Sequence, residues 1–432
     1  MNPRILSWPS LSKTEKAALL ARSEADIAQA MGEVGKILEA VKAEGDSALI
    51  RYTKQFHGAE LSPETLRVNE KEITAAERSI PKPVADAIKT SVANVRSCHE
   101  DQLPGPLSLR EVVPGVFAGE RAAPIPSVGL YAPRGKGSFP SSMYMMAVPA
   151  SVAGVPRIVV VSPPDQKGAC DPATIFAASL CGITEIYRIG GVQAMAALAY
   201  GTESIPAVAK IVGPGSQYVT AAKRLLFGTV DIGLPAGPSE SLMIADDTTD
   251  PKLAALDLLI EAEHGPDSQV LLVTPSAALA RAVASELSRL ASELPEPRRS
   301  FVEKVFTGYG GIIVVAGLEE AADVANEVAP EHLQIATAEP FALLGLVRNA
   351  GEILLGQHTP FSLANYTIGV NAVIPTGGAA RTWSPLSTRD FMKWSSIAYA
   401  TRAGYSSIKD SAVALANYEG FPAHARALRE RR

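Results

Sequence analysis

Cysteine is scarce in this sequence, and its spacing excludes two kinds of small, cross-linked fold. The 432 residues contain three cysteines, Cys98, Cys170 and Cys181, which lie far apart and form no Cys-x-x-Cys pair. A disulfide framework and a cysteine zinc site both need several cysteines at characteristic spacings. The sequence therefore excludes both, and so few cysteines indicate a protein of the reducing cytoplasm.

Long apolar runs and a strong charge bias are absent as well. No run reaches the roughly 18 apolar residues that a membrane-spanning helix requires, and the first residues lack the apolar segment of a secretory signal. The 40 basic and 45 acidic side chains give a formal charge of −5, without the concentrated basic face that binds a phosphate backbone. We therefore expect a cytoplasmic protein that binds neither membranes nor nucleic acid.

Three common nucleotide-binding and catalytic motifs are also missing. Glycine-rich turns do follow several apolar segments, as in YAPRGKGS, IGGVQA, GPGSQY and LPAGPSES. Backbone amides in such turns can hold phosphates or other anions. None of them has the spacing of a G-x-G-x-x-G fingerprint, a P-loop or a G-x-S-x-G nucleophile elbow, so neither a standard nucleotide site nor a hydrolase elbow is predicted.

Hydrophobic residues, in contrast, are plentiful. They make up 47% of the chain and charged residues 20%, which is enough apolar material for a large core. A chain of this length is two to three times the usual size of one domain, so we expect at least two globular units.

The apolar pattern predicts an α/β fold. The first hundred residues have mostly helical spacing. Two series of short, β-rich segments follow, separated by stretches of helical length, and this alternation is typical of parallel sheets that are buried on both faces. We predict two related, open, mostly parallel sheets flanked by helices, with strands near 127–133, 157–164, 185–191 and 209–215, and then near 241–247, 268–274, 310–317 and 351–356. After about residue 384 a polar, helical stretch resembles an arm more than a domain.

One helix places two possible metal ligands near its end. Asp250 is a suitable N-cap, Pro251 suits the first helical position and Gly265 follows the end. Glu261 and His264 then lie three residues apart on one face of the last turn, a spacing that suits two ligands of one metal ion. The alternative is a histidine favoured by the helix dipole beside a solvated glutamate.

A second pair of titratable residues stands at an element junction. In VAPEHLQIAT, Pro330 ends a helix and a strand begins, which places Glu331 and His332 where side chains can face a cleft. An adjacent carboxylate and imidazole can share acid and base work. The alternative is a surface glutamate beside a structural histidine.

Several motifs, in this order, resemble the histidinol dehydrogenase family. They are GLYAP, SSMYMMAVPASVAG, IGGVQAMAALAYGTESIP, GPGSQYVTAAKR, LPAGPSE, EAEHGPDSQ, APEHL and EGFPAHA, and the resemblance extends from about residue 25 to the C-terminus. It implies a homodimeric, zinc-dependent, NAD-linked enzyme that oxidises a primary alcohol through an aldehyde to a carboxylate. It also implies an incomplete Rossmann-like sheet without the usual fingerprint.

The resemblance implies a role for individual residues. Glu331 matches the acid/base glutamate that activates water, and His332 matches the general base. Positions that contact NAD are Tyr131, Gln193 and Ser216. Positions that line the substrate are Ser239, Glu419 and Ala372, and positions that match the metal ligands are Glu261, His264, Asn365 and His424.

At the metal, this sequence departs from the family pattern. The family has glutamine where this chain has Glu261, and aspartate where it has Asn365. The carboxylate and the amide have changed places, so Glu261, His264, Asn365 and His424 still form a four-ligand zinc set with one negative charge.

In the substrate pocket, Ala372 stands where the family has a substrate-binding histidine, and Ser216 replaces a usual asparagine on the NAD side. Because a site built around a hydrogen bond loses discrimination when one partner disappears, the changes indicate a substrate other than histidinol. The leading hypothesis is an NAD-dependent alcohol dehydrogenase of this family that acts on another small polar alcohol. A genuine histidinol dehydrogenase and an inactive, metabolite-binding homologue are the alternatives.

The resemblance also suggests a division of the chain into four parts. We expect an N-terminal helical segment (1–25), a larger α/β domain with the metal and catalytic residues (26–129 and 240–384), a Rossmann-like nucleotide-binding domain (130–239) and a C-terminal dimerisation arm (385–432). The arm is too poor in apolar residues to fold alone and is expected to cross to the partner of a homodimer.

Overall fold

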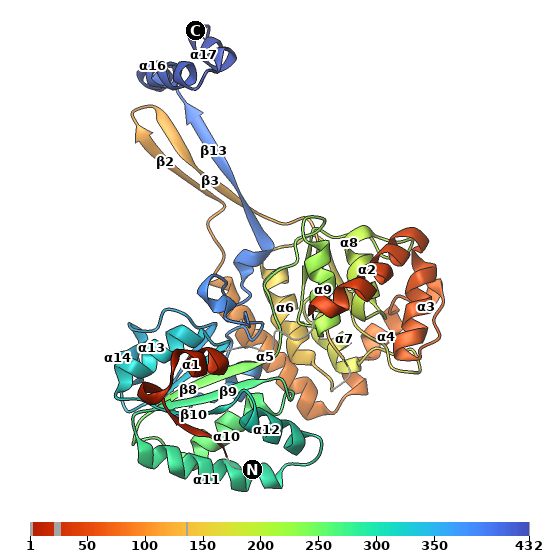
Figure 1. Cartoon of the computed structure of the whole chain (residues 1–432). Coiled ribbons are helices and arrows are strands. Elements are labelled where there is room, and N and C mark those ends of the chain that lie inside the picture. Colours follow the sequence, from red (N-terminus) through yellow and green to blue (C-terminus); the bar gives the residue numbers. More distant parts are fainter. Residues whose placement is uncertain (1–2, 21–26, 135–136, 432) are drawn as a thin grey trace.

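Two parallel sheets form the body of the molecule, as predicted (Figure 1). The computed structural model describes residues 3–20, 27–134 and 137–431. The larger sheet has six strands, each parallel to its neighbours. In spatial order they are β1 (Ile5–Ser7), β10 (Gly311–Val314), β9 (Gln269–Thr274), β8 (Glu240–Ala245), β11 (His332–Ala336) and β12 (Glu352–Leu355).

Helices cover both faces of the six-stranded sheet because its central strands are apolar on both sides. Leu258 and Val302 pack with Leu272 on one face, and Val324 and Leu343 pack with the strands on the other. The first face is covered by α10 (Pro251–Ala262), α11 (Ala277–Glu293) and α12 (Arg298–Thr307), and the second by α13 (Leu318–Val328) and α14 (Pro340–Leu344). Two further helices of this part are α1 (Lys13–Leu20) and α15 (Phe361–Tyr366).

The second parallel sheet has four strands and the same layered build. Its order is β6 (Ile186–Tyr187), β5 (Ile158–Val161), β4 (Val128–Tyr131) and β7 (Lys210–Val212). One face packs against α5 (Lys82–Glu100), α6 (Pro140–Val152) and α7 (Pro172–Ser179). The other face packs against α2 (Ile27–Glu44), α3 (Asp46–His57), α8 (Gly191–Tyr200) and α9 (Gln217–Leu226).

The observed packing differs from the predicted division of the chain at both of its first boundaries. Residues 1–25 hold a strand as well as a helix, since β1 pairs with β10 in the six-stranded sheet; residues 21–25 lie outside the described part. Residues 27–100 were expected in the larger domain, but α2, α3 and α5 bury their apolar faces on the four-stranded sheet. Helical spacing shows which face is apolar, whereas the surface that covers it is set by tertiary contacts.

The C-terminal arm contains a strand that the sequence did not predict. A nine-residue strand, β13 (Met392–Ala400), pairs antiparallel with β3 (Val116–Pro124), which pairs in turn with β2 (Leu107–Val113). This three-stranded ribbon projects from the two parallel sheets and carries α16 (Arg402–Tyr418) and α17 (Pro422–Arg429) at its tip (Figure 1). The arm is therefore a strand followed by helices, and not helical throughout.

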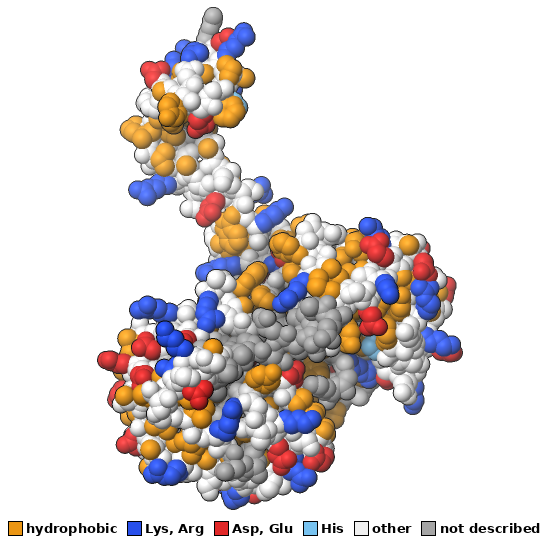
Figure 2. Space-filling model, viewed as in Figure 1, with side chains coloured by type: hydrophobic (Ala, Val, Ile, Leu, Met, Phe, Trp, Pro, Cys, Tyr) orange, Lys and Arg blue, Asp and Glu red, His pale blue; other side chains and the backbone are white. Residues whose placement is uncertain are grey.

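The tip of the extension exposes hydrophobic side chains (Figure 2). Leu415 is 62% exposed, Tyr418 90% and Phe421 50%. Large apolar side chains gathered on a projecting element are typical of a surface that another chain covers.

The remaining elements are short. A helix, α4 (Glu70–Ala75), precedes α5, and 3-10 turns lie at Trp8–Ser10, Pro63–Thr65, Glu77–Ser79, Ala379–Arg381 and Thr388–Phe391. Among the described residues, no helix is long and apolar enough to cross a membrane.

Candidate active site

The predicted catalytic residues gather where the two parallel sheets meet. Glu331 and His332 lie at the amino end of β11, whereas Tyr131 ends β4 and Pro214 follows the carboxyl end of β7. A cavity of about 240 Å³ lies here and is lined by Glu331, His332, Pro133 and Pro214, among other residues. The four-stranded sheet thus offers the strand ends that bind ligands in open α/β proteins, and the six-stranded sheet contributes its opposite ends.

Glu331 and His332 are buried and fixed by hydrogen bonds. Glu331 Oε2 accepts a hydrogen bond of 2.9 Å from the backbone N–H of Glu240. His332 Nδ1 lies 2.8 Å from Glu352 Oε2, and the ring meets Phe361 edge-on. The other ring nitrogen, Nε2, lies 3.8 Å from Glu331 Oε1, so the two predicted catalytic groups face each other.

Burial and nearby charges shift the pKa of both groups upward. Burial raises the pKa of Glu331 to about 8, and the carboxylates of Glu261 and Glu240 act in the same direction. Burial lowers the pKa of His332, but the carboxylates of Glu261, Glu331 and Glu352 outweigh it and raise this pKa to about 10. Two coupled acid-base groups therefore occupy one buried site, a pattern typical of active sites.

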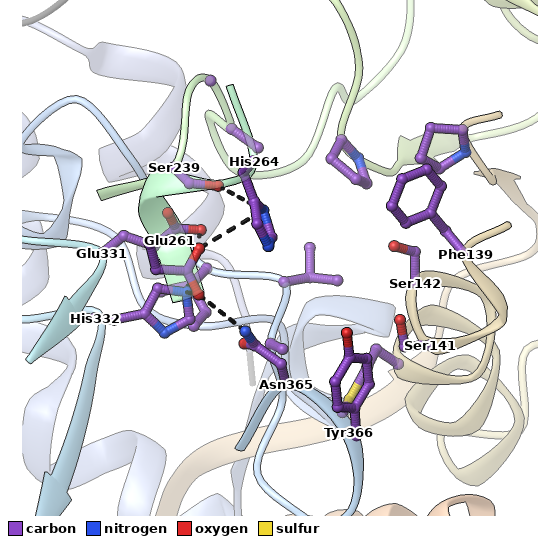
Figure 3. Close-up of a pocket in the computed structure, with 18 residues that line it drawn as sticks. Phe139, Ser141, Ser142, Ser239, Glu261, His264, Glu331, His332, Asn365 and Tyr366 are labelled. Atoms are coloured by element: carbon purple, nitrogen blue, oxygen red, sulfur yellow. Dashed lines mark hydrogen bonds and ion pairs between the residues drawn. The ribbon is translucent and has the colours of Figure 1, made fainter. Parts of the chain in front are cut away.

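Three of the four predicted metal ligands come together beside this pair (Figure 3). Glu261 is fully buried; its Oε1 accepts a hydrogen bond of 2.9 Å from Asn365 Nδ2, and its Oε2 lies 3.6 Å from His264 Nδ1. Ser239 Oγ is 3.1 Å from the same His264 nitrogen. Although burial opposes it, the charge of His332 and that of His264 hold the pKa of Glu261 below its usual value.

The helix that supplies Glu261 begins where the sequence predicts. Asp250 caps α10, since its carboxylate accepts hydrogen bonds from the backbone N–H groups of Lys252 and Leu253, and Pro251 takes the first helical position. The helix ends at Ala262, so His264 lies in the turn after it and not in its last turn. Glu261 is buried and is not the solvated side chain of the alternative interpretation.

The wall opposite the metal-ligand positions was not predicted. Phe139, Ser141 and Ser142 at the start of α6 and Tyr366 at the end of α15 line the cavity across from His264 (Figure 3). Their signal in the sequence is weak, because hydroxyl groups at helix ends are common everywhere.

Two buried carboxylates, Glu240 and Glu352, were also missed. Each is the first residue of a strand that is otherwise mostly apolar, and a charged residue in that position is the sequence feature that could have revealed them. Ala372, which the sequence assigned to the substrate pocket, lines the cavity with Val373 and Ile374.

The predicted NAD-contacting residues lie on the side of the four-stranded sheet. Ser216 directly precedes α9 and lines a second cavity of about 530 Å³, which shares Ser239 and His264 with the first. Tyr131 Oη accepts a hydrogen bond of 3.4 Å from the backbone N–H of Gly191. Gln193 is completely buried, and its side-chain amide has no hydrogen-bond partner among the described residues. Tyr131 and Gln193 are not among the residues that line either cavity.

Two predicted site residues lie elsewhere in the single chain. Glu419 follows α16 and His424 is in α17, both at the tip of the extension (Figure 1). Among residues 3–20, 27–134 and 137–431, no cluster of three or more His, Cys, Asp or Glu side chains is arranged to hold a metal ion.

Known proteins resemble this chain over nearly its whole length. A model of the histidinol dehydrogenase family matches residues 20–432. The chain belongs to the histidinol dehydrogenase family. It is 51% identical over 428 residues to a histidinol dehydrogenase of Synechocystis sp., covering 99% of both chains. It is 49% identical over 422 residues to "histidinol dehydrogenase homolog 2" of Mesorhizobium japonicum, covering 98% of this chain and 96% of that one.

Solved structures support the same family. The crystal structure of histidinol dehydrogenase from Elizabethkingia anophelis superposes with a TM-score of 0.93 at 35% identity, covering 99% of this chain and 97% of that one. An acetylating aldehyde dehydrogenase from Geobacillus thermoglucosidasius has a TM-score of 0.50 at 13% identity, a likeness of fold alone. Histidinol dehydrogenases are NAD-dependent oxidoreductases that convert an alcohol to an acid, and this chain has their fold over nearly its full length.

Proposed function

We propose that this protein oxidises the primary alcohol of a small polar substrate other than histidinol, through an aldehyde to a carboxylate, with NAD as the electron acceptor and zinc at the substrate. The observation that supports it best is the buried pair Glu331 and His332, which lies beside Glu261 in the wall of one cavity. Acid-base groups next to a ligand set for a cation are what alcohol oxidation requires.

The chain's own residues divide the proton transfers between them. His332 Nε2 takes the hydroxyl proton of the alcohol, because this nitrogen faces the cavity while Nδ1 is held by Glu352. Glu331 then accepts a proton from the water that attacks the aldehyde; its raised pKa, about 8, matches a general base near neutral pH. In both stages NAD, when bound, accepts a hydride from the carbon being oxidised.

The residues present fit a zinc ion. Glu261 Oε2 is buried and accepts no hydrogen bond from the described residues, so a carboxylate oxygen is left for a cation. His264 and Asn365 supply a nitrogen and an oxygen donor beside it, and we propose His424 of the partner subunit as the fourth ligand. Zinc, when bound, polarises the ligating group of the substrate. Because Glu261 is the carboxylate that most raises the pKa of His332, neutralising the charge of Glu261 would shift His332 toward its neutral, basic form.

We propose that NAD binds in the second cavity, which Ser216 lines. This cavity adjoins the substrate cavity through Ser239 and His264, which allows a hydride to pass between the two ligands.

The substrate is proposed to differ from histidinol because of Ala372. Its methyl group lines the cavity together with the apolar side chains of Val373 and Ile374, so this wall offers no hydrogen bond to an imidazole. The 51% identity to a histidinol dehydrogenase favours the alternative of a genuine histidinol dehydrogenase.

A substrate screen tests the proposal. Purified protein loaded with zinc is mixed with NAD and with amino alcohols, polyols, sulfonated alcohols or histidinol, and NADH absorbance is followed. We expect two NADH per molecule of one non-histidinol alcohol and very slow turnover of histidinol. Robust oxidation of histidinol would decide for the alternative, and a zinc content near zero in active protein would reject the metal site.

A further inference from the structure

A buried carboxylate that the proposed chemistry does not use lies behind His332. Glu352 opens β12, which pairs with β11 in parallel register so that His332 stands opposite Glu352. Its side chain is almost completely buried, and Oε2 lies 2.8 Å from His332 Nδ1. Glu352 is not among the residues that line the cavity, so it reaches the reaction only through the imidazole.

Stability alone does not account for this carboxylate. The rest of β12 is apolar, and a buried ion pair seldom stabilises a fold more than apolar side chains of similar volume do. The second oxygen of Glu352, Oε1, accepts no hydrogen bond from the described residues, which adds a desolvation cost. A group kept at such a cost beside an acid-base histidine indicates a functional role.

The geometry leaves His332 one ring nitrogen for chemistry. A carboxylate accepts hydrogen bonds, so Nδ1 must carry the proton that lies between it and Glu352. The other nitrogen, Nε2, points toward the cavity-lining carboxylates, 3.8 Å from Glu331 Oε1 and 4.0 Å from Glu261 Oε1. Phe361, fully buried, meets the ring edge-on and limits its rotation.

We infer that Glu352 is a positioning residue that holds the proton of His332 on Nδ1 and so presents Nε2, as the proton acceptor, to the substrate. The expected effect of Glu352 on turnover rests on the proposed function. The hydrogen bond between Glu352 and His332 does not. Glu352 and His332 form the same pair of groups as the carboxylate and histidine of a hydrolytic triad, in which the carboxylate selects the tautomer.

A spectroscopic experiment tests the hydrogen bond without any substrate. Zinc-loaded protein with ¹⁵N-labelled histidine rings should show an Nδ1–H proton that is assigned to His332 by its loss in His332→Ala. We expect this proton in the wild type, in Glu352→Asp and in Glu352→Gln, whose side chains still accept a hydrogen bond, and not in Glu352→Ala.

Asp257→Asn is a matched control for the spectra. It removes another buried carboxylate. Asp257 Oδ2 accepts a hydrogen bond of 2.9 Å from Nε2 of Gln334, which lies on the same strand as His332, and Asp257 does not touch His332 itself. The His332 proton should be unchanged in this variant. An unaltered Nδ1–H signal in Glu352→Ala would overturn the inference, whatever the substrate proves to be.

Kinetics on the substrate found by the screen test the consequence. Glu352→Ala should lower kcat about 10²-fold, within the range of positioned acid-base groups, and leave KM nearly unchanged, because Glu352 does not line the cavity. Glu352→Gln should recover part of this loss. In a His332→Ala background Glu352→Ala should cost nothing further; an equal loss in both backgrounds would show that Glu352 is merely structural. Failure to find a substrate would count against the proposed function and leave the spectroscopic result intact.

Discussion

At the scale of single residues, the site is a set of acids around one base. Glu261, Glu331 and Glu352 all lie within 4.0 Å of the imidazole of His332. Each carboxylate has its own neighbour that keeps it in place: Asn365 for Glu261, a backbone N–H for Glu331 and the imidazole itself for Glu352. Different tasks can therefore be given to chemically identical groups by their surroundings.

Substitutions of the central pair should separate the two oxidation steps. His332→Ala should lower alcohol turnover about 10²–10⁴-fold, the usual contribution of a positioned acid-base group. Glu331→Gln should slow aldehyde oxidation more than alcohol oxidation, because only the second step consumes a water molecule. Single-turnover assays that start from the alcohol or from the aldehyde measure the two effects. Wild-type rates in both variants, with NAD and zinc bound, would show that these residues are not catalytic.

A buried acid outside the reaction should show in the pH dependence of stability. Burial raises the pKa of Asp257 to about 6, and the hydrogen bond from Gln334 only partly offsets this. The folded protein thus holds a proton on Asp257 up to about pH 6, whereas an unfolded aspartate releases it near pH 4. The folded state therefore becomes less stable as the pH rises from about 4 to about 6. Asp257→Asn, which stays neutral, should be more stable by about 2–3 kcal/mol above pH 7.

This gain should shrink toward zero near pH 4, where both proteins are uncharged at this position. Urea unfolding at pH 5, 6 and 7.5 measures it. The exposed residue Asp247 provides the control, since Asp247→Asn should change stability little at any of these pH values. If the stability gained by Asp257→Asn did not grow with pH, the raised pKa of Asp257 would be contradicted.

At the scale of elements, α10 shows how local sequence positions a residue that lines the cavity. Its cap, Asp250, fixes the start of the helix whose last turn supplies Glu261. Asp250→Ala removes the acceptor for two backbone N–H groups and should destabilise the protein by about 1 kcal/mol. Asp250→Asn keeps that acceptor and should retain most of the stability. Urea midpoints measured side by side test this; equal midpoints for the alanine and asparagine variants would show that the cap is unimportant.

The elements also explain how much of the structure could be predicted from the sequence. Strands buried on both faces, such as β8 and β9, appear as continuous apolar runs and were found. The exposed strands β2 and β13 were missed, because they are stabilised by pairing with β3 and not by a buried face that would give an apolar pattern. For β13 this partner also lies far away in the sequence. Likewise the contact between Glu352 and His332 depends on strand register across 20 residues, which no local pattern contains.

The same limit applies to the site. Glu331, His332, Glu261, His264 and Asn365 were named from motifs and lie together. Their roles remain predictions. Glu419 and His424 were also named from motifs, but in the single chain they lie on the extension and do not line this cavity.

At the scale of the whole molecule, the extension stands apart from the two parallel sheets (Figure 1). Its tip exposes Leu415, Tyr418 and Phe421, and it bears two residues that the family resemblance places in the active site. We propose that each arm reaches the site of the other subunit in a homodimer, so that each site combines His332 of one chain with His424 of the partner subunit.

Mixing two inactive variants tests the exchange. His332→Ala and His424→Ala proteins are unfolded together and refolded, which makes half of the dimers mixed. With exchanged arms, each mixed dimer has one complete site, so activity should recover to about a quarter of the wild-type value. Each variant refolded alone is the control. No recovery despite demonstrated mixed dimers would show that the arm returns to its own chain.

The carboxyl ends of β4 and β7 and the amino end of β11 meet at the cavity. This arrangement has a consequence for how such an enzyme can evolve to act on a new substrate. The loops that follow β4 and β7 border the cofactor side and come from residues 128–239, whereas Glu261, Asn365 and Ala372 all come from the chain after it. Substitutions in the later segment can reshape one wall without disturbing the other. Gene duplication followed by substitutions in that segment alone would thus yield a dehydrogenase of a new alcohol that keeps the same cofactor.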